Sequence, residues 1–144
     1  MNVTLSFDDF NGQLHDGITA NAILSEIQRV IEGATVRRAG ANITYEAGDS
    51  DGAESSSTMN IEVHSKLGCM LHYMPGAQTE CVSLADETRL TEIIENGDCN
   101  PQFAGLYMPP EQAIHAIKEF CRTGKPDVTV RWMDVCELPD LYPE

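Results

Sequence analysis

The sequence predicts an α+β fold, with a mainly antiparallel sheet of about five to six strands and two principal helices packed on it. Residues 19–33 and 110–123 carry apolar side chains at helical spacing, while the chain between them alternates apolar and polar residues in short runs. At 144 residues, the chain is long enough to build a core without disulfides or metals, which predicts a single domain, residues 1–144.

Both helices have recognisable ends. The first begins after a cap at Thr19 or Asn21 and closes at Gly33. In the second, Pro110 suits the first helical position, because an N–H group would have no partner there, and Gly124 supplies the left-handed residue after the last turn. These signals are local, so they predict where each helix begins and ends.

The strands are predicted from alternation between turn residues. Residues 69–74 are apolar at nearly every position, as expected of a central strand covered on both faces. Leu90, Ile93 and Ile94 predict a short acidic helix within residues 85–106. The expected strands are residues 3–7, 42–46, 59–63, 69–74, 81–84 and 128–132.

Three segments are rich in acidic or small polar residues. Residues 47–58 predict an acidic loop or hairpin tip, residues 86–98 lie in the most acidic stretch, and residues 134–144 form an acidic C-terminal tail. Each is compatible with a surface that meets a basic partner or with a solvated stretch that has no such role. Asp49 and Asp51 resemble the start of a calcium loop, but its closing glutamate is absent, so we expect no metal or other cofactor.

Acidic residues dominate the charge of the chain. Nine basic and 23 acidic residues give a formal net charge of −14, which repels nucleic acid and anionic membranes and speeds encounter with a basic partner. The same net charge also fits an acidic protein that has no basic partner.

The five cysteines contain no Cys-x-x-Cys pair, which predicts that they are small core residues in a reducing compartment. We expect no signal peptide or membrane span, and hence a cytoplasmic protein.

No catalytic motif stands out. The histidines do not have the spacing of metal ligands, and there is no phosphate loop, dinucleotide fingerprint or nucleophile elbow. The His-x-Glu and Pro-Cys-x-x-Cys signature of zinc deaminases is also absent. We therefore expect that the protein is not an enzyme. The alternative is a small-ligand-binding or enzymatic α+β domain that uses His64, His72 and a cysteine in a cleft.

The last quarter of the chain carries a specific pattern. It contains Pro-Glu-Gln-Ala at 110–113, Glu-Phe at 119–120, Thr-Gly-Lys-Pro at 123–126 and Val-Arg-Trp at 130–132. This pattern resembles the first-numbered immunity-protein family of bacterial polymorphic toxin systems, whose members are similar to the immunity protein of the double-stranded-DNA cytosine deaminase toxin. Residues 69–74 resemble a central strand of that family more loosely.

The resemblance implies a stoichiometric inhibitor. Its partner would be the C-terminal domain of a cognate toxin, a nucleic-acid deaminase whose basic substrate site the inhibitor covers, with no direct binding to nucleic acid or membrane. The alternative within the same class is an immunity protein for a different basic toxin, such as a nuclease, because immunity surfaces diversify with their toxins.

Toxin-binding residues are predicted from charge density and expected exposure, because the resemblance does not cover them. Phe120 and Trp132 do match the family pattern, but we assign both to the core, since an apolar residue on a regular face is first a packing residue. The predicted contact residues are Asp49, Asp51, Glu54, Asp86, Glu87, Glu92, Glu95, Asp98 and Tyr107.

Overall fold

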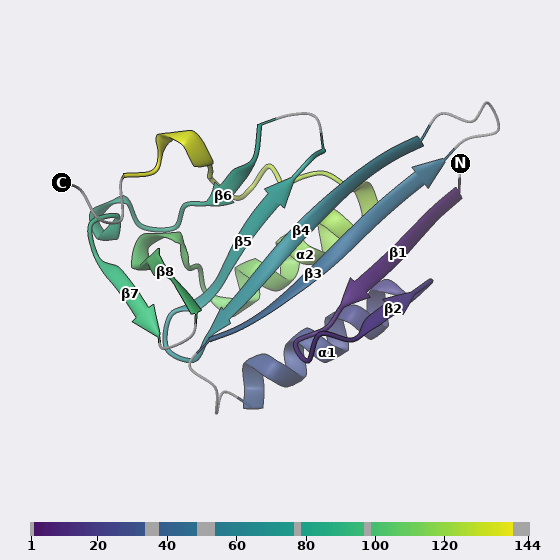
Figure 1. The fold of residues 1–144 in the computed structure, drawn as a ribbon, viewed down its shortest axis with the longest axis horizontal. Helices are drawn as coiled ribbons and strands as arrows, with labels where there is room; N and C mark the ends of the chain where they lie inside the picture. Colours follow the sequence, from purple (N-terminus) through teal and green to yellow (C-terminus); the bar gives the residue numbers. More distant parts are fainter. Residues whose placement is uncertain (1, 34–37, 49–53, 77–78, 97–98, 140–144) are drawn as a thin grey trace.

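The computed structural model describes the chain except for residues 1, 34–37, 49–53, 77–78, 97–98 and 140–144. Within the described residues, two helices lie against one face of a seven-stranded antiparallel sheet, which confirms the α+β prediction (Figure 1). The strand order is β2-β1-β3-β4-β5-β6-β9, and β7 pairs with β8 in a separate hairpin. No described helix has the length and apolar character needed to cross a membrane. The elements are β1 Asn2–Asp8, β2 Leu14–Asp16, α1 Ala20–Gly33, β3 Arg38–Gly48, β4 Glu54–His64, β5 Gly68–Met74, β6 Cys81–Ser83, η1 Glu87–Arg89, β7 Ile93–Asn96, β8 Cys99–Phe103, η2 Ala104–Leu106, α2 Pro110–Thr123, β9 Trp132–Asp134 and η3 Val135–Glu137.

The helix ends are those that the sequence predicts. The Thr19 hydroxyl accepts a hydrogen bond from the Ala22 N–H at 3.2 Å, so Thr19 caps α1. Pro110 occupies the first turn of α2. Gly124 has φ of +71° and its N–H donates to the Phe120 carbonyl at 2.7 Å, which closes the helix.

The main core lies between the helices and one face of the sheet. Alternate residues of β1, β3, β4 and β5 point toward α1 and α2, as the period of a strand requires. A smaller cluster lies on the opposite face, where β8, η2 and the residues next to them cover β5, β6 and β9 and one end of β4. The largest fully buried side chains are Phe7, Ile23, Ile27, Ile43, Met59, Ile61, Leu71, Leu106, Met108, Ile117 and Phe120.

The predicted loop over residues 47–58 is shorter than expected. β3 continues to Gly48, and β4 begins at Glu54, so that Ser57 lies opposite Tyr45 in the ladder. Small polar residues are poor strand formers alone, but pairing with a neighbouring strand overrides that preference. β2 is a further strand that the sequence did not predict.

The predicted helix within residues 85–106 is wrong. The segment forms the short 3-10 turn η1 followed by the β7–β8 hairpin, in which Ile93 lies opposite Phe103. Three apolar residues in so short a run fit a helix and a strand almost equally, and pairing with β8 decides between them.

The predicted strand over residues 128–132 is also wrong in its bounds. Val128 is 96% exposed, and β9 begins only at Trp132. The cause is Asp127, whose carboxylate accepts hydrogen bonds from the N–H and hydroxyl groups of Thr129 at 2.9 and 2.8 Å. Its carbonyl also accepts from the Val130 N–H and the Trp132 indole. An aspartate that bonds the backbone two residues ahead forms a turn instead of a strand.

The turn makes stability depend on pH. Burial acts to raise the pKa of Asp127, but hydrogen bonds from Thr129 and from His115, whose ring nitrogen lies 2.6 Å away, hold that pKa below its ordinary value. A carboxylate with a lowered pKa stabilises the fold above its unfolded pKa, and this stability is lost as the pH falls through the folded pKa.

We expect Asp127→Asn to reduce the free energy of unfolding at pH 7 by about 1–3 kcal/mol. It should also flatten the loss of stability on acidification below roughly pH 4. Urea unfolding across pH 2.5–7 measures both effects. Asp134→Asn is the matched control, because Asp134 caps η3 with one backbone hydrogen bond; a control with the same acid profile as Asp127→Asn would contradict this account.

Candidate partner-binding surface

The predicted contact residues divide between two ends of the molecule. Glu54 begins β4 at the end of the β3–β4 ladder, whereas His64, at the other end of β4, has its ring 5.7 Å from that of Tyr107. β3 and β4 have 11 residues each, so the Glu54 and His64 ends of β4 are roughly 35 Å apart. Glu95 belongs to β7, on the Tyr107 side. Asp49, Asp51 and Asp98 lie outside the described residues.

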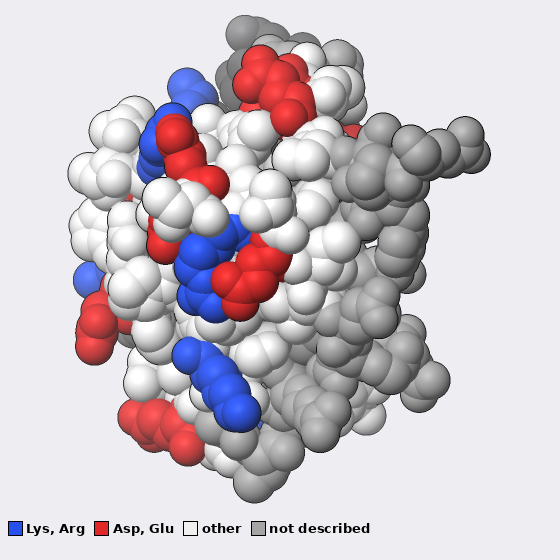
Figure 2. Space-filling model, turned by 90° about the vertical axis from the view of Figure 1, so that its left-hand side faces the viewer, with Lys and Arg blue, Asp and Glu red and all other residues white. Residues whose placement is uncertain are grey.

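Ion pairs offset the charge of the segment that begins at Asp86. The Glu92 carboxylate accepts two hydrogen bonds from Arg89, at 2.7 and 2.8 Å, which hold its pKa below the usual range. Glu87 pairs with Arg131, and Asp86 caps η1 through Thr88. On this side of the molecule, basic side chains therefore lie among acidic ones (Figure 2). Charge density predicts that this acidic segment meets a basic partner; in the structure, the charge of the segment's surface is mixed.

Tyr107 is buried, with 5% of its surface exposed. Its hydroxyl donates a hydrogen bond to the Glu62 carboxylate, and its ring packs edge-on against His64. Together with Asp86 and Arg89, Tyr107 lines a cleft of about 510 Å³. Asp86 and Tyr107 are thus predicted residues that the fold brings together.

The same cleft contains His64 and a cysteine, two of the residue types that the enzymatic alternative uses. Its cysteine is Cys69, and burial raises the pKa of this thiol to about 12, which favours the neutral form. His64 accepts hydrogen bonds from two backbone N–H groups through Nδ1. His72 lies elsewhere on the sheet, 3.0 Å from Glu80. In the described part of the chain, no group of three or more His, Cys, Asp and Glu residues is arranged to hold a metal.

Within the described residues, no layer covers a large part of one face of the sheet. The helices cover one face, and on the other face the second apolar cluster lies over β5, β6 and β9 and reaches the His64 end of β4 through Tyr107. The uncovered face of β2, β1, β3 and β4 carries mainly Thr, Ser and Asn side chains. Arg38 falls on this face by register, at the His64 end, but its side chain is not described. The charged side chains described on this face are all acidic: Asp8, Asp16 and Glu46 are uncovered, and Glu62 bonds Tyr107.

A hollow of about 550 Å³ lies at one end of this uncovered face. It is formed where β1, β3 and β4 run side by side, and Thr4, Glu46 and Ser56 are cross-strand neighbours in it. Sequence reasoning missed Glu46. Alternation around Ile43 and Tyr45 does place it outward, but which face remains uncovered depends on where the helices pack.

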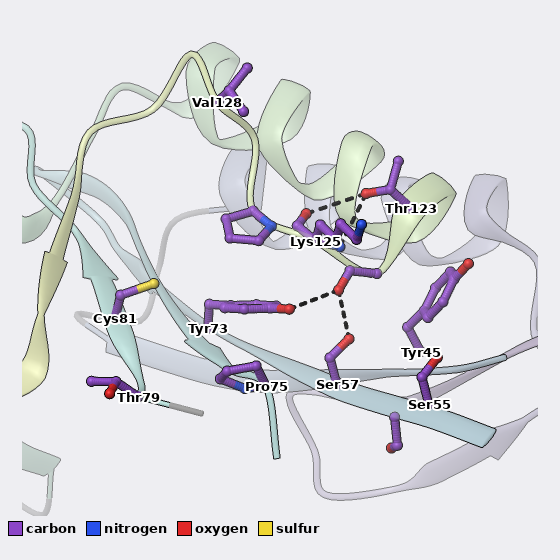
Figure 3. A pocket seen from close by; sticks show the side chains of 13 residues that line it. Tyr45, Ser55, Ser57, Tyr73, Pro75, Thr79, Cys81, Thr123, Lys125 and Val128 are labelled. Carbon is purple, nitrogen blue, oxygen red and sulfur yellow. Dashed lines mark hydrogen bonds between the residues drawn. The ribbon is translucent and has the colours of Figure 1, made fainter. Parts of the chain in front are cut away.

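A cavity of about 720 Å³ lies at the C-terminal end of α2. The hydroxyls of Ser57 and Tyr73 converge there on the Gly124 carbonyl, at 2.7 and 3.0 Å (Figure 3). Burial raises the pKa of the Tyr73 phenol, which keeps it a hydrogen-bond donor. These bonds tie the end of the helix to the sheet, and Val128 stands exposed beside the cavity.

The segment that resembles immunity proteins forms α2, this junction and β9. The uncovered face and the two hollows that flank the start of β4 are contributed mainly by the rest of the chain. Their role is inferred from their own chemistry, since no protein-family model, curated protein or solved structure matches the chain.

Proposed function

We propose that this chain is a cytoplasmic immunity protein that binds a cognate bacterial toxin acting on nucleic acid, a deaminase, and blocks its basic substrate site. The observation that carries the proposal is an uncovered sheet face whose described charges are all negative, in a chain of net charge −14. The pattern in the last quarter of the sequence supports it. The chain acts by occupying a surface and needs no catalytic group of its own.

Charge suits such a partner. A domain that binds nucleic acid carries lysines and arginines for the phosphates, and an acidic face is complementary to them. Complementary charge speeds encounter and selects among partners, and it acts most strongly at low ionic strength. The uncovered face presents hydroxyl and amide groups between its carboxylates, so contacts with a basic groove can extend beyond the charges.

Tight inhibition also requires apolar contact. Nanomolar to picomolar affinity corresponds to about 12–16 kcal/mol, which exposed ion pairs do not supply. The cavity at the end of α2 offers the rings of Tyr45 and Tyr73 and the exposed Val128. It shares Ser55 and Ser56 with the hollow on the uncovered face, so the two hollows adjoin at the start of β4, from opposite faces of the sheet.

The proposal is tested by titrating the purified chain into a DNA-deamination assay with the toxin domain encoded beside its gene. We expect complete inhibition near one molar equivalent, because a tight stoichiometric binder leaves no free toxin beyond that point. An unrelated acidic protein of similar net charge is the control, and it should not inhibit at the same concentration.

The other outcomes separate the alternatives. If the chain binds a toxin that cleaves nucleic acid without deaminating it, the immunity role is kept and the toxin is a nuclease instead of a deaminase. Absence of binding at micromolar concentration overturns the proposal.

A further inference from the structure

The hollow on the uncovered face contains a carboxylate with no partner. Glu46 is exposed at the wall of the hollow, and no hydrogen bond or ion pair within the described chain engages it. The other described wall residues are neutral, with Asn2, Thr4 and Ser56 beside it. A carboxylate in a polar recess is a site of negative potential that a cation can fill.

The arrangement of oxygen atoms favours one kind of cation. Thr4, Glu46 and Ser56 lie directly opposite one another on β1, β3 and β4, so their side chains form a row with strand spacing of about 4.8 Å. A guanidinium is planar and has five N–H donors with no acceptor, so it can bond a carboxylate in two places and neighbouring oxygens at once. A lysine ammonium is a compact point charge and does not match an extended row.

We propose that the Glu46 hollow binds an arginine side chain of the basic partner that docks on the uncovered face. This inference rests on the proposed function and assigns the centre of the contact to the end of the sheet where β3 ends, at Gly48, and β4 begins. Docking there removes the arginine and Glu46 from water together with Ser55 and Ser56, which belong to both hollows. A desolvated, hydrogen-bonded charge pair then slows dissociation.

The test compares two variants with the same change of charge. Glu46→Gln keeps the shape of the side chain and removes its charge, and Glu32→Gln makes the same change on the exposed side of α1, on the helix-covered side of the sheet. We measure association and dissociation rates with the toxin domain encoded beside the gene. Glu46→Gln should weaken binding ~30-fold or more, mostly through faster dissociation. Glu32→Gln should change binding by less than about twofold.

The arginine is identified on the toxin side. Its arginines are replaced one at a time by alanine, and one replacement should weaken binding no further when combined with Glu46→Gln. Equal affinities for Glu46→Gln and Glu32→Gln overturn this inference and leave the proposed function standing. A wild-type chain that forms no complex overturns both. Thermal unfolding of each variant confirms that the fold is intact.

Discussion

Gly68→Ala is expected to cause a severe loss of stability, although it adds only one methyl group. Gly68 has φ of +100°, and a Cβ atom there would lie 2.0 Å from the carbonyl oxygen of Met108. That carbonyl accepts the Cys69 N–H at 2.9 Å, and the Met108 N–H donates back to Cys69 at 2.8 Å. The substitution therefore strains the backbone and separates the start of β5 from the segment that leads into α2.

We expect the free energy of unfolding to fall by roughly 4 kcal/mol or more, measured by urea unfolding. Gly12→Ala is the control, because Gly12 also has positive φ, at +79°, and nothing lies within 4 Å of its added Cβ. It should cost about 1–2 kcal/mol, the part due to conformation alone. If the free energy of unfolding falls equally in the two variants, the backbone near Met108 moves at little cost to accommodate the added methyl group.

Phe120→Ala is expected to have the next largest effect, a loss of about 3–5 kcal/mol. Phe120 has no exposed surface, and its ring packs edge-on against Tyr45 and Tyr73 at centroid distances of 6.2 and 6.1 Å. Removing the ring leaves a cavity between α2 and the sheet and takes away both aromatic contacts. The same urea experiment measures the effect.

Val128→Ala is the comparison for Phe120→Ala. Alternation in the sequence places Val128 on a half-buried strand, but the structure leaves its side chain in solvent. We expect its substitution to change stability by less than about 0.5 kcal/mol. If Val128→Ala loses as much stability as Phe120→Ala, Val128 is buried as on the predicted strand, which would contradict the turn at Asp127.

The helices were predictable because their signals are local. Thr19, Pro110 and Gly124 each act on backbone groups within one turn, so their effect does not depend on the rest of the fold. Two other segments were not predictable, because pairing with a neighbouring strand decides their conformation. Within residues 85–106 that neighbour is β8, and for the part of residues 47–58 that belongs to β4 it is β3. Residues 127–131 lie between these cases, since an aspartate two residues before a threonine is a turn signal that apolar alternation obscured.

The contact residues show the same limit. Glu92 and Arg89 are three residues apart, but Glu87 meets Arg131 across the fold, so the sequence does not reveal how much of this charge is offset. Burial of Tyr107 likewise depends on the cluster around β8 and η2. Whether Asp86, Glu87, Glu92 and Glu95 touch a partner remains a prediction. Glu46 became a candidate only when the face left uncovered by the helices was known.

The order of strands also bears on how the protein folds. In the described sheet, every ladder from β2 through β6 joins strands that are consecutive in the chain or one strand apart, and only β6–β9 spans α2. Mostly short-range pairing favours rapid folding, because little loop entropy is lost before each ladder forms. The sheet can grow in sequence order during synthesis, and β9 adds to its edge last. Under the proposed function, the chain has to fold before its toxin becomes active, and this topology favours that order.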